Sequence, residues 1–116
     1  MLAYHSGLQY YLYAGAVDMR KGCYSLAGLV SRELGKDPLQ GEVFIFLSAS
    51  ARQIKILCFE GDGFGLYQKR LEGGTFERPV VSGHSVTLSA SELRFLMEGI
   101  VLKSIERRVR YQHQNG

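Results

Sequence analysis

The stretch from residue 54 to residue 76 constrains the fold of this chain more than any other segment. It opens with a run of β-branched, aromatic and large apolar residues at 54–59, and Gly61-Asp62-Gly63 then supplies the positive φ angles that a tight hairpin turn requires. We therefore predict two strands, over 54–59 and 64–71, followed by a second turn at Gly73-Gly74. A glycine-rich loop that cradles phosphate is followed by a helix, whereas a strand follows here, which favours the hairpin.

Positive charge lies on this hairpin, at Lys55 and at Lys69-Arg70. Tyr67 and Phe76 are close to these cations in sequence, so the hairpin is a plausible nucleic-acid surface: cations contact phosphates, and aromatic rings stack on bases. The alternative is a solvated strand face on which the cations pair with the neighbouring carboxylates of Glu72 and Glu77.

Length and composition favour one compact domain. The chain has 116 residues, of which 46% are hydrophobic, and a domain of this size folds without a metal or a disulfide. Cys23 and Cys58 have no His or Cys at ligand spacing, so we expect reduced thiols and no cofactor. The longest apolar run has five residues and no leader-like segment opens the chain, so we expect a soluble cytoplasmic protein that does not enter membranes.

The net charge of +3 arises entirely from the last fourteen residues. They contain one anion, Glu106, and four cations, Lys103, Arg107, Arg108 and Arg110. We therefore divide the chain into a domain over 1–102 and a basic extension over 103–116. A basic tail can bind nucleic acid, or it can merely keep the protein in solution.

The remaining segments complete an α+β pattern. We predict a strand over 8–13 that Gly15 ends, a helix between Asp18 as N-cap and Gly35, and a buried strand over 43–47. A short strand over 86–88 and a helix with a Ser89/Glu92 capping box follow, whereas 76–79 is predicted as an edge segment. The fold class is a single α+β domain, with a mostly antiparallel sheet of about five strands and two main helices.

Arg20 and Lys21 fall in the first turn of the predicted helix, where the helix dipole favours anions. Either a carboxylate such as Asp18 neutralises them, or they await an external anion such as a phosphate.

Catalytic chemistry has weaker support. Asp18, Glu60, Asp62 and Glu72 would together suit a metal-dependent nuclease, but their spacing does not bring them together. The histidines are far apart in sequence and no supporting Ser or Cys motif accompanies them.

Three blocks resemble a known family: residues 15–22 (GAVDMRKG), residues 55–57 (KIL), and residues 69–76 (KRLEGGTF) with Pro79. They are similar to the TnpB accessory proteins, also called Orf2-like, of one bacterial insertion-sequence family, family sixty-six. This TnpB shares only a name with the RNA-guided nuclease. The resemblance covers about residues 8–100. Many relatives have tryptophans after the Lys-Ile-Leu block, where this chain has Cys58-Phe59, and the basic extension is a second departure.

The resemblance implies a non-enzymatic protein, encoded beside a separate transposase, that assists transposition. We expect it to bind the DNA of the element's ends, its transposase, or both; the alternatives are an adaptor for the transposase without DNA contact and, third, a nuclease built on Asp18, Glu60 and Asp62. A homo-oligomer is compatible with the sequence. The residues expected to bind nucleic acid or a partner are Arg20, Lys21, Lys55, Lys69, Arg70, Arg107, Arg108 and Arg110, and those expected to support the motif are Asp18, Gly22 and Glu72.

Overall fold

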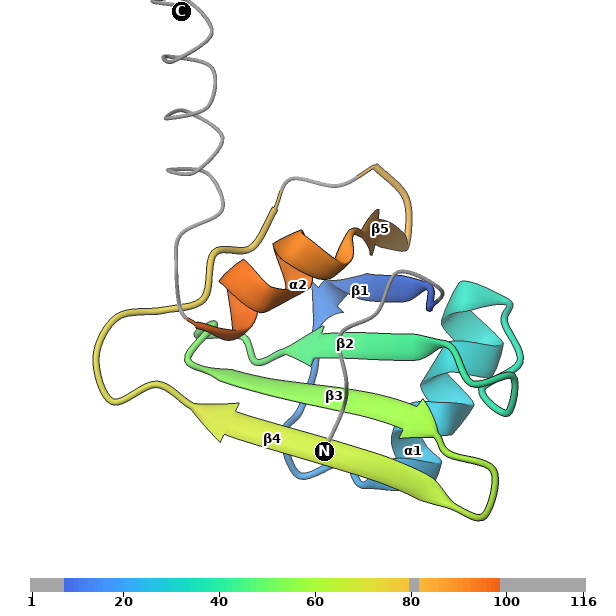
Figure 1. Ribbon diagram of the computed structural model, residues 1–116. Helices are drawn as coiled ribbons and strands as arrows, with labels where there is room; N and C mark the ends of the chain where they lie inside the picture. Colours follow the sequence, from blue (N-terminus) through green and yellow to red (C-terminus); the bar gives the residue numbers. More distant parts are fainter. Residues whose placement is uncertain (1–7, 80–81, 99–116) are drawn as a thin grey trace, which may run out of the picture.

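The computed structural model describes residues 8–79 and 82–98. They form one five-stranded sheet in the order β4-β3-β2-β1-β5 (Figure 1). Its strands are β1 (Tyr10–Ala16), β2 (Val43–Leu47), β3 (Gln53–Phe59), β4 (Phe64–Arg70) and β5 (Ser85–Leu88). β1 and β2 are parallel, and the other three pairings are antiparallel. The predicted α+β class and the mostly antiparallel sheet are confirmed.

Two helical segments cover opposite faces of the sheet (Figure 1). After β1, α1 (Cys23–Leu29) continues into a π-helical segment, η1 (Val30–Leu34), and α2 (Ala90–Met97) follows β5. The side chains of α2 pack with Ile54 and Ile56 of β3, whereas those of α1 pack with Leu57. Because neighbouring strand residues point to opposite faces, β3 supplies both cores.

The central strand and the second helix agree with their predictions. All five residues of β2 are buried, because the sheet is covered on both faces. The Ser89 side chain accepts the Glu92 main-chain N–H, and the Glu92 carboxylate accepts the Ser89 N–H, so the capping box is complete. Cys23 and Cys58 are free thiols that pack on opposite faces.

Two element boundaries were predicted wrongly. Gly15 does not end β1, which runs on to Ala16 through an irregularity in its pairing with β2. Asp18 does not cap α1, which begins at Cys23 with Gly22 as N-cap and no side-chain bond there. The physical reason is that the Asp18 carboxylate instead accepts hydrogen bonds from Arg20 and so closes a separate turn.

The segment after β4 is not a strand. Residues 71–79 have no strand assignment, although the Phe76 N–H donates to the Ala51 oxygen at 2.6 Å and the Phe76 ring is buried. In the hairpin turn Gly61 has a φ of 96°, whereas Gly63 is not among the positive-φ glycines. The predicted domain boundary at residue 102 lies outside the described residues, as do Arg107, Arg108 and Arg110. Within the described ranges, neither helix has the length and apolarity to cross a membrane.

Candidate nucleic-acid interface

One end of the sheet gathers most of the motif residues. β1, β2 and β4 all finish there, since β1 and β2 are parallel and β4 is antiparallel to β3, and β3 starts there. The loop over 17–22 leaves β1 at this end, where the Val17 N–H donates to the Leu47 oxygen at 2.9 Å. Segments distant in sequence therefore present their side chains together.

Asp18 and Arg20 form an exposed ion pair in this loop. The Arg20 Nη2 lies 2.6 Å from the Asp18 Oδ2, Nε lies 3.0 Å from Oδ1, and the Arg20 main-chain N–H also donates to Oδ1. These side-chain and main-chain hydrogen bonds hold the pKa of Asp18 well below its ordinary value of 3.8. For Arg20, neutralisation by Asp18 is thus the correct one of the two predicted alternatives.

Lys55 is not a surface cation. It is buried, with 6% of its surface exposed, and its Nζ donates to the main-chain oxygen of Lys21 at 2.7 Å. The prediction that Lys55 contacts a phosphate is therefore wrong. Because a buried ammonium must have a hydrogen-bond partner, Lys55 acts as a positioning residue that holds the loop of Lys21 against β3.

Lys69 faces the other side of the sheet. In the strand register Lys69 lies opposite Ile54, whose side chain belongs to the core under α2. The Lys69 Nζ donates to the main-chain oxygen of Met97, at the end of that helix. A cation there satisfies a terminal carbonyl and suits the helix dipole. The structure thus separates Lys55 from Lys69, and the single hairpin surface predicted from sequence does not exist.

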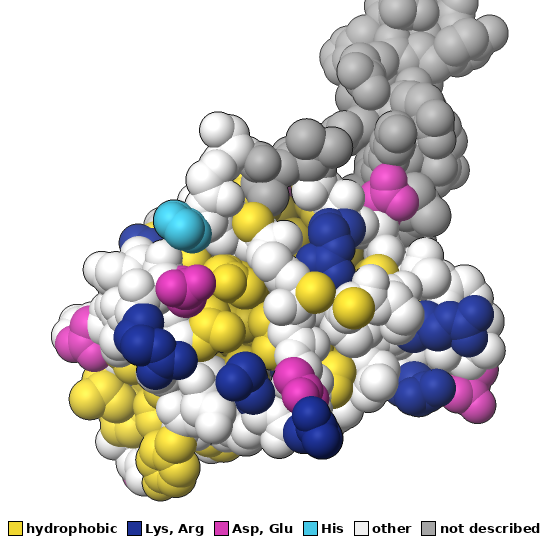
Figure 2. Space-filling model, turned by 180° about the vertical axis from the view of Figure 1, so that it is seen from behind, with side chains coloured by type: hydrophobic (Ala, Val, Ile, Leu, Met, Phe, Trp, Pro, Cys, Tyr) yellow, Lys and Arg dark blue, Asp and Glu magenta, His cyan; other side chains and the backbone are white. Residues whose placement is uncertain are grey.

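Three cations of the described chain have side chains without a hydrogen-bond or ion-pair partner within it, at the same end of the sheet: Lys21, Arg52 and Arg70. Arg52 and Arg70 are exposed and Lys21 is partly exposed. Arg70 lies opposite Gln53, on the face that carries Lys55 and α1. We call Arg20, Lys21, Arg52 and Arg70 the basic surface. On the α1 side, Figure 2 shows Lys and Arg side chains at separate points, with Asp and Glu between them.

Arg78 is a structural residue that sequence reasoning missed. Its Nη2 donates to the Ser48 oxygen at 2.6 Å and its Nη1 to the Gly15 oxygen at 3.3 Å. It therefore ties the segment after β4 to the ends of β1 and β2. The sequence signal for this role was that Arg78 lies next to Pro79 of the third motif block. The sequence could not show its partners, because they are main-chain oxygens, which every residue has.

The other motif residues have simpler surroundings. Gly22 is the N-cap of α1 in an extended conformation, and the position of its missing Cβ is open space. Glu72 is exposed and has no side-chain partner within the described chain. Both are close in sequence to the basic surface: Gly22 follows Lys21, and Glu72 lies two residues after Arg70.

The carboxylates proposed for a nuclease are not brought together. Asp18 follows β1, at the end of the sheet where β3 begins, whereas Glu60 and Asp62 follow the opposite end of β3. Among residues 8–79 and 82–98 there is no group of three His, Cys, Asp or Glu side chains that could hold a metal ion.

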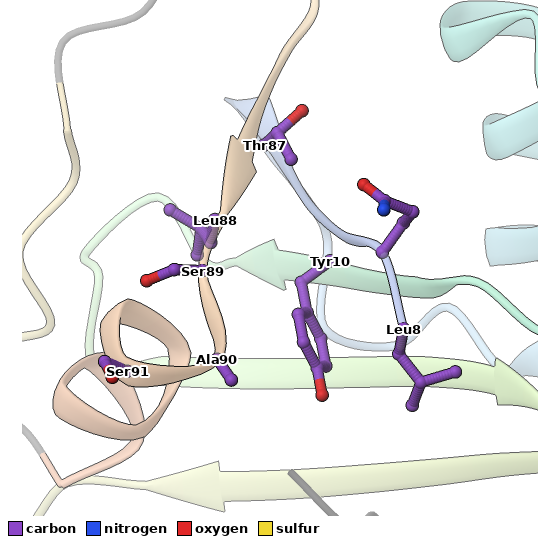
Figure 3. A pocket seen from close by; sticks show the side chains of 8 residues that line it. Leu8, Tyr10, Thr87, Leu88, Ser89, Ala90 and Ser91 are labelled. Atoms are coloured by element: carbon purple, nitrogen blue, oxygen red, sulfur yellow. The ribbon is translucent and has the colours of Figure 1, made fainter. Parts of the chain in front are cut away.

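A pocket lies at the far end of β1, between this strand, β5 and the start of α2 (Figure 3). It has a volume of about 540 Å³ and is lined by Leu8, Gln9, Tyr10, Thr87, Leu88, Ser89, Ala90 and Ser91. Figure 3 shows Leu8 and Tyr10 pointing to one side of the strand and Thr87 pointing away. None of the described residues that line this pocket is charged, so we take the basic surface as the candidate site.

Comparisons with known proteins identify one family and two similar proteins. The family described as "IS66 Orf2 like protein" matches residues 8–107. The chain is 34% identical over 100 residues to the uncharacterized protein y4hO of Sinorhizobium fredii (strain NBRC 101917 / NGR234), covering 86% of this chain and 87% of that protein. It is 29% identical over 108 residues to the uncharacterized protein y4jC of the same strain, covering 93% and 92%. No solved structure matches the chain significantly.

Proposed function

The chain belongs to the IS66 Orf2-like family of transposition accessory proteins, and we propose that it assists transposition without catalysing it, by binding the DNA of the element through the basic surface. The observation that carries this proposal is that the cations at this end of the sheet differ in what their side chains bind. Lys55 and Lys69 donate to main-chain carbonyls, whereas the side chains of Lys21, Arg52 and Arg70 have no hydrogen-bond or ion-pair partner in the described chain.

Phosphate oxygens would be the first ligands of this surface. Exposed Lys and Arg side chains bind the DNA backbone and release its counterions, which gives affinity that falls steeply with salt. Such contacts position a protein on DNA but do not read its sequence. Arg107, Arg108 and Arg110, outside the described residues, would add affinity of the same sequence-independent kind.

Fluorescence anisotropy tests the proposal, with an end fragment of the element and a scrambled duplex as ligands over about 50–200 mM salt, the range in which phosphate contacts show their salt dependence. The test variant replaces Lys21, Arg52 and Arg70 with alanine. The control replaces Arg32, Lys36 and Arg94, three other cations of the described chain, and so has the same net charge.

We expect the test variant to lose affinity and its salt slope to fall by about 0.9 for each phosphate contact removed. The control should bind like the wild type. An equal loss in both variants would show that only net charge matters, and unchanged binding by the test variant would remove the basic surface from DNA recognition.

An adaptor function for the transposase is the second candidate, because anions lie next to the basic surface. Asp18 and Glu72 are exposed beside it, and mixed charge suits a protein partner better than a phosphate backbone. Co-purification with the transposase of the same element, without DNA binding at the lowest salt, would favour the adaptor.

A further inference from the structure

Tyr24 is a large aromatic residue that the fold holds at the surface. It occupies the second position of α1 and is 85% exposed. Its ring meets the Phe64 ring edge-on, with centroids 6.1 Å apart and planes at 90°, and Phe64 packs in turn against Phe59 with centroids 5.2 Å apart. An edge-on contact steadies the Tyr24 ring and leaves at least one of its faces uncovered by Phe64.

The sequence pointed to two other rings, Phe76 and Tyr67, as base-stacking groups, and neither has a ring face as open to solvent as that of Tyr24. Phe76 is buried, with 2% of its surface exposed, and Tyr67 packs against the core under α2. Neither can present an open ring face beside the basic surface. The structure replaces them with Tyr24, which sequence reasoning did not consider.

Tyr24 lies on the same face of the sheet as Lys21 and Arg70. Phe64 starts β4 and packs in the α1-side core, and Arg70, six residues along the strand, has the same side-chain direction. These two positions are about 20 Å apart at the usual rise per residue. Between them lies the main chain of Lys21, since it is bonded to Lys55 and Lys55 pairs with Gln68. The Tyr24 ring, the main chain of Lys21 and the Arg70 side chain therefore lie in this order along the direction of β4.

We propose that this row binds unpaired DNA, with a nucleobase stacked on Tyr24 and phosphates further along the same strand on Lys21 and Arg70. The inference rests on the proposed DNA-binding function and adds the form of the DNA. In a duplex the base faces are covered by their neighbours, so a protein ring gains a stacking partner only where bases are unstacked, as in single strands. Figure 2 shows hydrophobic side chains gathered on the same side of the molecule as separate Lys and Arg side chains.

The test compares binding of a fluorescent oligothymidine and of a duplex to wild-type protein, Tyr24→Ala and Tyr24→Phe. Leu39→Ala is the matched control, because Leu39 is the other large hydrophobic residue exposed in the described chain. Thermal unfolding of each variant verifies that the fold is kept, which we expect for exposed positions.

Tyr24→Ala should weaken oligothymidine binding by about 5- to 150-fold, the range for loss of one base–aromatic stack. Tyr24→Phe should bind like the wild type, because stacking needs the ring and not the hydroxyl, and duplex affinity should be unchanged in both. Leu39→Ala should alter neither.

Oligothymidine binding by Tyr24→Ala at wild-type strength would overturn the stacking site, as would an equal loss of duplex and single-strand affinity. If the triple variant at Lys21, Arg52 and Arg70 loses duplex binding while Tyr24→Ala is normal on both ligands, the stacking site fails and the proposed function stands. If the wild type binds neither ligand, both fail together.

Discussion

The Nζ of Lys55 donates a hydrogen bond of 2.7 Å to the main-chain oxygen of Lys21. Residues of the second motif block therefore position the first, because buried Lys55 of β3 fixes the loop that carries Arg20 and Lys21. Lys69 and Arg78 act in the same way on the carbonyls of Met97 and Ser48. Of these three cations, Lys55 supports the basic surface directly without belonging to it.

Replacing Lys55 should cost stability. Lys55→Met keeps the apolar stem but removes the ammonium and leaves the Lys21 oxygen without its donor, so we expect the free energy of unfolding to fall by about 1.5–3 kcal/mol, the range for a hydrogen bond to a charged group. Urea denaturation measures the change. Lys21→Met is the control and should stay within about 0.5 kcal/mol, because the Lys21 side chain has no hydrogen-bond or ion-pair partner in the described chain. Equal effects would show that the bond to Lys21 does not stabilise the fold.

Arg78 should be irreplaceable by lysine. Its two terminal nitrogens reach two different carbonyls, those of Ser48 and Gly15, and a single ammonium cannot reproduce this fork. We expect Arg78→Lys to lower the free energy of unfolding by about 1–3 kcal/mol, the cost of leaving a buried polar group unpaired. The comparison is thermal denaturation of Arg70→Lys, because Arg70 is exposed and its side chain has no hydrogen-bond partner in the part of the chain that the structure describes. If Arg78→Lys melted at the same temperature as Arg70→Lys, the two hydrogen bonds from Arg78 to the Ser48 and Gly15 carbonyls would not stabilise the fold.

The sequence predicted what depends on neighbouring residues. The hairpin, the buried β2 and the capping box of Ser89 and Glu92 follow from local periodicity and turn chemistry, and all three are present. The partner of Lys55 could not be predicted, because it is a main-chain oxygen 34 positions away. The start of α1 was misplaced because Asp18 suits both a cap and a turn, and only the bonds to Arg20 decide between them.

Loss of the Arg20 guanidinium should raise the pKa of Asp18. In the wild type, hydrogen bonds from Arg20 hold this pKa below 3.8, so we expect Arg20→Gln to move it up toward that value. Because the folded-state pKa is depressed, the ion pair stabilises the fold above pH 3.8, and this contribution is lost as the pH falls through the folded-state pKa. NMR titration of the side-chain carboxyl carbons measures the pKa of Asp18 in the wild type and in Arg20→Gln.

Asp37 provides the internal control for that titration. Its pKa is lowered by hydrogen bonds from the Leu39 N–H and from Gln40, and it has no bond to Arg20. It should titrate identically in both proteins. An Asp18 midpoint near 3.8 in the wild type would mean that the ion pair does not persist in solution.

Removal of the Ser89 hydroxyl should weaken the start of α2. This hydroxyl accepts the Glu92 N–H at 3.0 Å, so Ser89→Ala should lower the free energy of unfolding by about 1 kcal/mol. Ser91→Ala, at an exposed position within the same helix, should have a smaller effect. Chemical denaturation of the two variants measures these changes. A larger loss of unfolding free energy for Ser91→Ala than for Ser89→Ala would show that the Ser89 cap does not stabilise α2.

Ala51 carries the backbone strain of the turn between β2 and β3. Its φ is 58°, a left-handed conformation that costs a residue with a Cβ about 1–2 kcal/mol. The conformation is kept because the Ala51 N–H donates to the Ser48 oxygen and its own oxygen accepts the N–H of the buried Phe76.

Ala51→Gly relieves the strain but gives the unfolded chain more freedom, worth about 0.4–1 kcal/mol. We therefore expect a net stabilisation of up to about 1 kcal/mol by urea denaturation, whereas Ala49→Gly, an exposed residue of the same turn without positive φ, should be neutral or destabilising. If both substitutions changed stability in the same direction and by the same amount, the strain at Ala51 would not be a property of the protein in solution.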